Sequence, residues 1–119
     1  MSSEHPELIE LGHKWIASWN ARDLEQVLTL YADDAEMTSD TIVRLGLAVQ
    51  GSLRGKDNLR LYWSKALPLA PHLHFDLIGL YTSPNSVIVH YKNDRGRTIC
   101  EYLRVGRDGR IVQGSANHL

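Results

Sequence analysis

The sequence predicts an α+β domain in which helices pack against one face of a curved, mainly antiparallel sheet. Helical periodicity dominates the first part of the chain, and β-rich runs separated by turn residues dominate its last part. Helices first and a meander of strands afterwards are typical of the α+β class. At 119 residues, the chain is long enough for one domain with one hydrophobic core, which we expect to span residues 1–119.

Three N-terminal helices are expected. Over residues 6–20, apolar side chains recur every three or four positions and form one stripe. Asp23 is a predicted N-cap for a second helix over residues 24–31, and Gln26 completes a capping box. This helix should end at residues 32–34. The third helix is expected over residues 56–67 and should end before Pro68.

Strands are expected at residues 35–39, 73–82, 86–93, 97–105 and 110–118, where β-branched and aromatic residues are frequent. Turn signals separate the last four, for example Asn93-Asp-Arg-Gly96. Residues 40–55 contain three glycines and are expected to form a loop with a piece of strand.

The composition excludes several classes of function. A net charge of −1 leaves no basic footprint for nucleic acid. The single cysteine, Cys100, excludes an internal disulfide and a cysteine-based zinc cluster, and no third ligand accompanies His72 and His74. The N-terminus is not typical of a signal peptide, and no apolar run is long enough for a membrane span. We therefore expect a cytoplasmic protein without metal or organic cofactor.

Glu101 is the most informative residue. Strand alternation places it on the same face as Ile99 and Leu103, and a buried carboxylate there needs a partner or keeps its proton. If Lys92 is paired with Arg97 across the preceding turn, His90 lies on this face as a diagonal neighbour of Glu101. Such a pair either relays a proton near neutral pH or forms a structural ion pair.

Other features indicate a ligand cavity and a second interaction surface. The helices carry many aromatic residues, which can line a cavity suited to a flat apolar ligand. Asp40 follows a strand end, where catalytic groups often lie. The same pairing places Tyr91 and Tyr102 on the other sheet face, which we expect to form a homodimer. No phosphate-binding loop or nucleophile elbow occurs, so any chemistry should be proton transfer.

Three segments resemble the SnoaL-like branch of the nuclear-transport-factor-2-like superfamily. They are Trp15-Ile-Ala-Ser-Trp-Asn-Ala-Arg-Asp-Leu, Leu30-Tyr-Ala-Asp-Asp-Ala-Glu and Leu53-Arg-Gly-Lys-Asp-Asn-Leu. The resemblance covers essentially the whole chain. It implies a cone in which three helices pack into a strongly bent sheet around a pocket. Members include isomerases, polyketide cyclases, epoxide hydrolases, dehydratases and non-catalytic binding proteins, so the fold alone does not determine the function.

The resemblance also assigns site positions. The tyrosine donor of the ketosteroid isomerases corresponds to Trp15, their aspartate base to Ser39 with Asp40 next to it, and their protonated aspartate to Glu101. An indole N–H cannot transfer its proton as a phenol does, which argues against the isomerase arrangement. The arginine of the epoxide hydrolases corresponds to Ile99, which argues against that activity.

We therefore expect a domain that binds a small, apolar, oxygenated molecule and performs proton transfer of the isomerase, cyclase or dehydratase type. Glu101 would donate a hydrogen bond, and His90 or Asp40 would be the base. The alternative is a non-catalytic ligand-binding or dimeric interaction module. The expected pocket residues are Trp15, Trp19, Tyr31, Met37, Ser39, Trp63, Ile88, Leu103 and His118.

Overall fold

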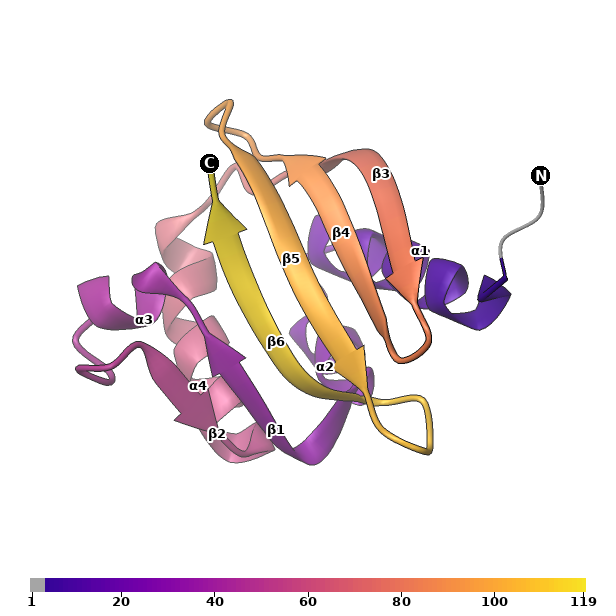
Figure 1. The fold of residues 1–119 in the computed structure, drawn as a ribbon. Coiled ribbons are helices and arrows are strands. Elements are labelled where there is room, and N and C mark those ends of the chain that lie inside the picture. The colour runs from indigo at the N-terminus through magenta and orange to yellow at the C-terminus, as the bar shows by residue number, and fades with distance from the viewer. Residues whose placement is uncertain (1–3) are drawn as a thin grey trace.

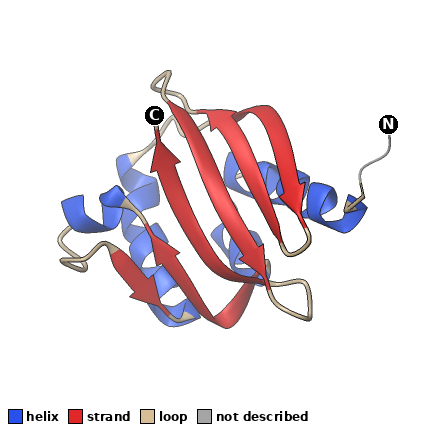
Figure 2. Ribbon diagram, viewed as in Figure 1, coloured by secondary structure: helices blue, strands red, loops and turns tan. Residues whose placement is uncertain are grey.

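A computed structural model describes residues 4–119. It contains one six-stranded sheet in the order β2-β1-β6-β5-β4-β3, with the helices on one face of the bent sheet (Figures 1 and 2). β1 and β6 are parallel, and the other neighbouring pairs are antiparallel. The predicted fold class, α+β with helices packed into a curved and mainly antiparallel sheet, is confirmed. The strands are β1 (Tyr31–Thr38), β2 (Ser52–Arg54), β3 (Asp76–Ser83), β4 (Ser86–Lys92), β5 (Thr98–Val105) and β6 (Ile111–His118).

The first helix, α1 (Pro6–Asn20), has the predicted bounds and buries Leu8, Leu11, Trp15 and Trp19. The second, α2 (Leu24–Thr29), begins as predicted, because Asp23 accepts a hydrogen bond from the backbone N–H of Gln26 at 3.1 Å. The backbone N–H of Asp23 bonds to Ser18 O. The capping box is therefore half formed.

The predicted end of α2 is wrong. Tyr31 opens β1, and the residues expected to end the helix belong to that strand. The chain changes from helix to strand at this point because the N–H of Ile111 donates to Leu30 O at 2.8 Å. Tertiary pairing with β6 overrides the helical pattern, as is common for short segments.

Residues 40–55 hold a helix that the prediction missed, α3 (Asp40–Arg44). Ser39 is its N-cap and accepts a hydrogen bond from Thr41 N at 3.2 Å, and Ile42 is fully buried beneath it. The later helix α4 (Lys56–Ala66) agrees with the prediction and continues into a short 3₁₀ turn, η1 (Leu67–Leu69). None of the helices formed by residues 4–119 is long and apolar enough to cross a membrane.

The predicted register between β4 and β5 is wrong by one residue. Lys92 pairs with Thr98 and not with Arg97. The turn therefore contains three residues after Asn93, and Gly96 takes the left-handed conformation with φ of 79°. Asn93 Oδ1 accepts hydrogen bonds from the N–H groups of Arg95 and Arg97, which stabilises this turn. Because side chains alternate along a strand, the one-residue shift exchanges the two faces of β4 relative to β5.

The exchange turns the apolar face of β4 toward the helices. Val87, Val89 and Tyr91 are buried there together with Glu101 of β5. His90 pairs with Cys100, and both lie on the outer face. Tyr91, expected on the outer face, is thus an inner residue.

Candidate functional site

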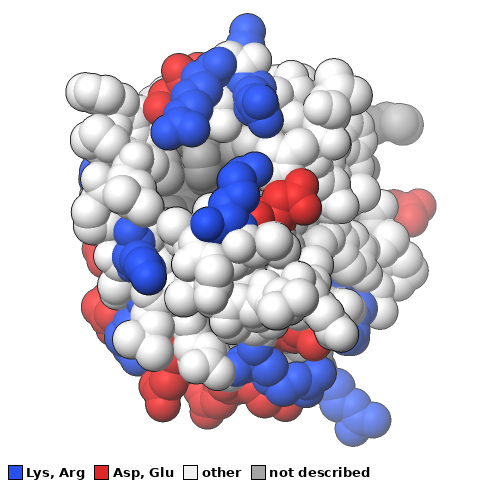
Figure 3. Space-filling model, turned by 90° about the vertical axis from the view of Figure 1, so that its left-hand side faces the viewer, with Lys and Arg blue, Asp and Glu red and all other residues white. Residues whose placement is uncertain are grey.

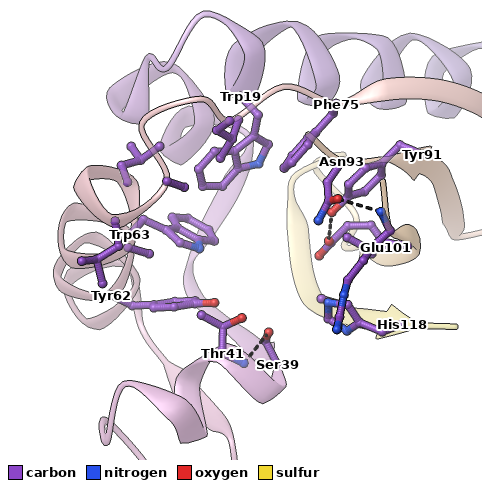
Figure 4. A pocket seen from close by; sticks show the side chains of 18 of the residues that line it. Trp19, Ser39, Thr41, Tyr62, Trp63, Phe75, Tyr91, Asn93, Glu101 and His118 are labelled. Carbon is purple, nitrogen blue, oxygen red and sulfur yellow. Dashed lines mark hydrogen bonds between the residues drawn. The ribbon is translucent and has the colours of Figure 1, made fainter. Parts of the chain in front are cut away.

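A cavity of about 590 Å³ lies between the sheet and the helices. This volume is within the range of small-molecule sites. All three tryptophans of the chain line it. Figure 4 shows Trp19, Tyr62 and Trp63 on the helical side of this main cavity and Tyr91 and Glu101 on the sheet side. The aromatic residues that line it are Trp15, Trp19, Tyr31, Tyr62, Trp63, Phe75 and Tyr91.

The aromatic wall is a continuous set of ring contacts. Phe75 stacks on Tyr91 with centroids 4.2 Å apart and on Trp15 at 5.7 Å. Trp63 meets Trp19 edge to face at 5.2 Å and Tyr31 at 5.1 Å. Rings that pack on each other keep fixed orientations, so the wall is a preformed aromatic surface.

Asn20 holds Phe75 in this wall. Its Nδ2 donates to Phe75 O at 2.9 Å, and its Oδ1 accepts from Phe75 N at 2.7 Å. This pair of bonds joins the end of α1 to the segment before β3, 55 residues later. Asn20 follows Trp19 directly, so adjacent residues of α1 line the cavity and hold Phe75 in place.

Glu101 lies at the sheet side of the main cavity and is 2% exposed. Its Oε1 accepts a hydrogen bond from the Tyr91 hydroxyl at 2.9 Å. Its Oε2 is buried and has no hydrogen-bond partner among the described residues. A buried carboxyl oxygen without a partner is costly, and such groups call for a functional explanation.

Burial raises the pKa of Glu101 from its ordinary value of 4.5 to about 7, although the Tyr91 hydrogen bond lowers it. The desolvated anion is disfavoured, and one phenol donor does not compensate for this. Near neutral pH the carboxyl group therefore exists in both forms and can accept or donate a proton. Burial also raises the pKa of Tyr91 and of Tyr31, so both remain phenols.

Two indole N–H groups behave differently in the wall. Trp15 Nε1 donates to the Tyr31 hydroxyl at 3.0 Å. Trp19 Nε1 is buried and has no acceptor among residues 4–119. Since an indole nitrogen can only donate, the partner that this position lacks is a hydrogen-bond acceptor.

Sequence-predicted site residues fall into two groups. Those that line the main cavity are Trp15, Trp19, Tyr31, Met37, Ser39, Trp63, Glu101 and His118. His118, at the end of β6, is the histidine on the sheet side in Figure 4. The structure places each of these residues along the main cavity, and their roles in binding or catalysis stay predictions.

Four predicted residues lie elsewhere. His90 and Ile88 point to the outer face because of the shifted register, so the expected His90–Glu101 pair does not form. Leu103 faces inward but is fully buried in the core. Asp40 is exposed at the start of α3 and borders a second, smaller hollow of about 300 Å³.

The prediction missed Phe75 and Tyr91 as wall residues, and it counted Tyr62 among the helical aromatic residues without placing it among the pocket residues. Phe75 was expected inside a strand that begins at residue 73, whereas it lies just before β3, which begins at Asp76. Tyr91 would have been found with the correct register, for which Gly96 in the turn was the available signal.

The chain matches the SnoaL-like domain family over residues 13–114. It belongs to this family. Among curated proteins, none matches the chain. A crystal structure of a SnoaL-like protein of unknown function from Burkholderia thailandensis E264 is 37% identical, with a TM-score of 0.90 over 96% of this chain and 95% of that one.

Two solved structures of lower identity show the shared fold alone. TerC, crystallised with polyporic acid, is 16% identical, with a TM-score of 0.78 over 95% of this chain and 92% of that chain. A protein from Sinorhizobium meliloti, whose proposed activity is that of a polyketide cyclase, is 13% identical. Its TM-score is 0.75 over 97% of this chain and 100% of that chain.

Proposed function

We propose that this SnoaL-like domain binds a small, flat, oxygenated and largely apolar molecule in the main cavity and catalyses proton transfer on it. The reaction would be of the isomerase, cyclase or dehydratase type. The observation that carries the proposal is the buried Glu101 carboxyl group, whose Oε2 has no partner among the described residues and which lines an aromatic cavity. TerC, a protein of this fold crystallised with an organic acid, supports small-molecule binding at the level of fold.

In the proposed mechanism, the protonated form of Glu101 is the active one. Tyr91 donates to Oε1, so the acidic proton is on Oε2 and directed at the ligand. A ligand carbonyl oxygen that gains negative charge in the transition state is then stabilised by this proton. The N–H of Trp19 supplies a donor to another ligand oxygen.

The base in this proposal is His118. It replaces the two bases expected from the sequence, because His90 is on the outer face and Asp40 is not among the residues that line the main cavity. An imidazole is suited to removing a proton from carbon near neutral pH. His118 and Glu101 come from the neighbouring strands β6 and β5.

The test begins with native mass spectrometry of the protein purified from its own host, which identifies any bound molecule. Turnover of that molecule is then compared in the native protein, Glu101→Gln and Glu101→Ala. The glutamine retains a hydrogen-bond donor and should therefore keep binding and part of the turnover. The alanine should lose both.

The control is Glu10→Gln, an exposed glutamate that pairs with Lys14 on α1. It should leave binding and turnover unchanged. Equal activity of the native protein and both Glu101 variants would remove Glu101 from the mechanism. Binding without turnover in every form would favour a non-catalytic ligand-binding module.

A second proposal concerns the outer sheet face, which we expect to form a homodimer. Tyr81 is 54% exposed and is directed to His90 across β3 and β4, with a 3.4 Å contact between its hydroxyl and Nδ1. Ile88 and Tyr102 pair beside them and are half-buried. An exposed apolar patch of this kind on a sheet face is typical of an interface between subunits.

A further inference from the structure

Three arginines line the main cavity without a carboxylate partner. Arg44 belongs to α3, and Arg95 and Arg97 belong to the turn between β4 and β5. All three are exposed, and none forms an ion pair among residues 4–119. We call these residues the arginine rim. Figure 3 shows basic side chains on the edge of a hollow in the molecular surface.

Three arginines elsewhere in the described part of the chain are neutralised by carboxylates, whereas Arg22, Arg104 and Arg107 form no ion pair there. Arg54 pairs with Glu36, Arg60 with Glu25, and Arg110 with Asp108. The chain as a whole has a net charge of −1. The positive charge at the rim is therefore a local feature and does not follow from a generally basic protein.

The rim is separate from the buried carboxyl group. Besides the arginines, the charged residues that line the main cavity are Asp94, next to Arg95 in the turn, and Glu101 in the interior. The pKa of Glu101 is set by burial and by Tyr91, and no arginine lowers it. Burial raises the pKa of Tyr62, and Arg44 is among the groups that act weakly against this rise. Arg44 is itself oriented by a 3.0 Å bond from Nη2 to Thr41 Oγ1.

We propose that the ligand is an organic anion, with a flat apolar body in the aromatic cavity and a negatively charged group, such as a carboxylate, held by the arginine rim. This inference rests on the proposed function and narrows its substrate class. Guanidinium groups bind carboxylates with paired, charge-assisted hydrogen bonds. The ligand oxygens that face Trp19 and Glu101 are then different from the charged group at the mouth.

A matched pair of probes tests the proposal. 2-Naphthoate and 2-naphthamide share one ring system, and only the first is charged. Because all three tryptophans line the cavity, intrinsic fluorescence reports its occupancy, and calorimetry provides the affinity. Both probes are titrated at pH 6, where Glu101 is largely protonated, in low and high salt.

The variants are Arg44→Gln, Arg95→Gln, Arg97→Gln and the triple substitution. Arg107→Gln is the matched control, since Arg107 is also exposed and without an ion pair among the described residues but lies in the turn between β5 and β6, at the other end of β5 (Figure 1). We expect 2-naphthoate to bind more tightly than 2-naphthamide at low salt. Each rim substitution should weaken 2-naphthoate about three- to tenfold and leave 2-naphthamide unchanged.

The outcomes separate this inference from the proposed function. Equal affinity of the two probes, insensitive to salt and to the rim substitutions, would overturn the anion proposal and leave the cavity as a site for neutral ligands. Failure of both probes to bind would overturn the proposed function, and this inference with it. Loss of affinity in Arg107→Gln equal to that in the rim variants would also overturn the anion proposal.

Discussion

The Tyr91 hydroxyl donates a 2.9 Å hydrogen bond to Oε1 of Glu101, and this is the contact that leaves Oε2 alone in the wall of the main cavity. The two residues are on neighbouring strands, where Tyr91 pairs with Ile99 and Glu101 with Val89. They are diagonal neighbours on the inner face. Their contact depends on the three-residue turn after Asn93.

The first prediction concerns stability against pH. Folding raises the pKa of Glu101 from 4.5 to about 7, so the folded state retains a proton that the unfolded state releases between these values. The free energy of unfolding should therefore fall as pH rises from about 4.5 to 7 and change no further through Glu101 above that. Between pH 5 and pH 8, this contribution is about 2 to 3 kcal/mol.

Urea denaturation of the native protein and Glu101→Gln at these two pH values measures this contribution. The variant lacks the titrating group, and all other groups titrate equally in both proteins. From pH 5 to pH 8, the unfolding free energy of the native protein should therefore fall by about 2 to 3 kcal/mol more than that of the variant. The same pH dependence in both proteins would show that Glu101 ionises normally in the fold.

Tyr91→Phe should raise the pKa of Glu101 further. The hydroxyl stabilises the carboxylate, and its removal favours the protonated form. A carboxyl carbon titration by NMR, with labelled glutamate, measures the shift directly. If Glu101 acts as the proton donor, the alkaline limb of the rate profile should move to higher pH by the same amount. A downward shift would contradict this assignment.

Asn20→Ala should destabilise the fold by about 2 to 3 kcal/mol, because it removes two hydrogen bonds and leaves the backbone groups of Phe75 unpaired. Asn58→Ala is the matched control. Asn58 is exposed and makes one bond, to Arg54 O, so its loss should cost less than about 1 kcal/mol. Urea denaturation compares the two, and equal losses would contradict the role of Asn20 as a clamp.

Tyr81→Glu should convert the proposed dimer to a monomer. The residue is 54% exposed, so the charge costs little in the monomer but would be desolvated in an interface on the outer face. Leu61→Glu, at a position of α4 that is 68% exposed, is the control and should leave the dimer intact. Sedimentation velocity measures the change, and a native protein that sediments as a monomer would refute the dimer.

Much of the fold was predictable from local patterns. The apolar stripe of α1, the Asp23 cap of α2 and the existence of the last four strands follow from spacing along one segment, which needs no knowledge of distant residues. The unusual place of Glu101 on an apolar face was visible for the same reason. Glu101 does face inward, but its hydrogen-bond partner is Tyr91 and not the expected His90.

The site could not be assembled from those patterns. A turn of three residues in place of two turned His90 outward and Tyr91 inward, because strand alternation transmits a single-residue shift along the whole hairpin. Phe75 is held in the wall by a hydrogen bond to its backbone from the side chain of Asn20, which is far away in the sequence. The arginine rim combines one residue of α3 with two residues of the β4–β5 turn. Periodicity describes one segment at a time, whereas register, the cavity and its charged mouth arise from packing between segments.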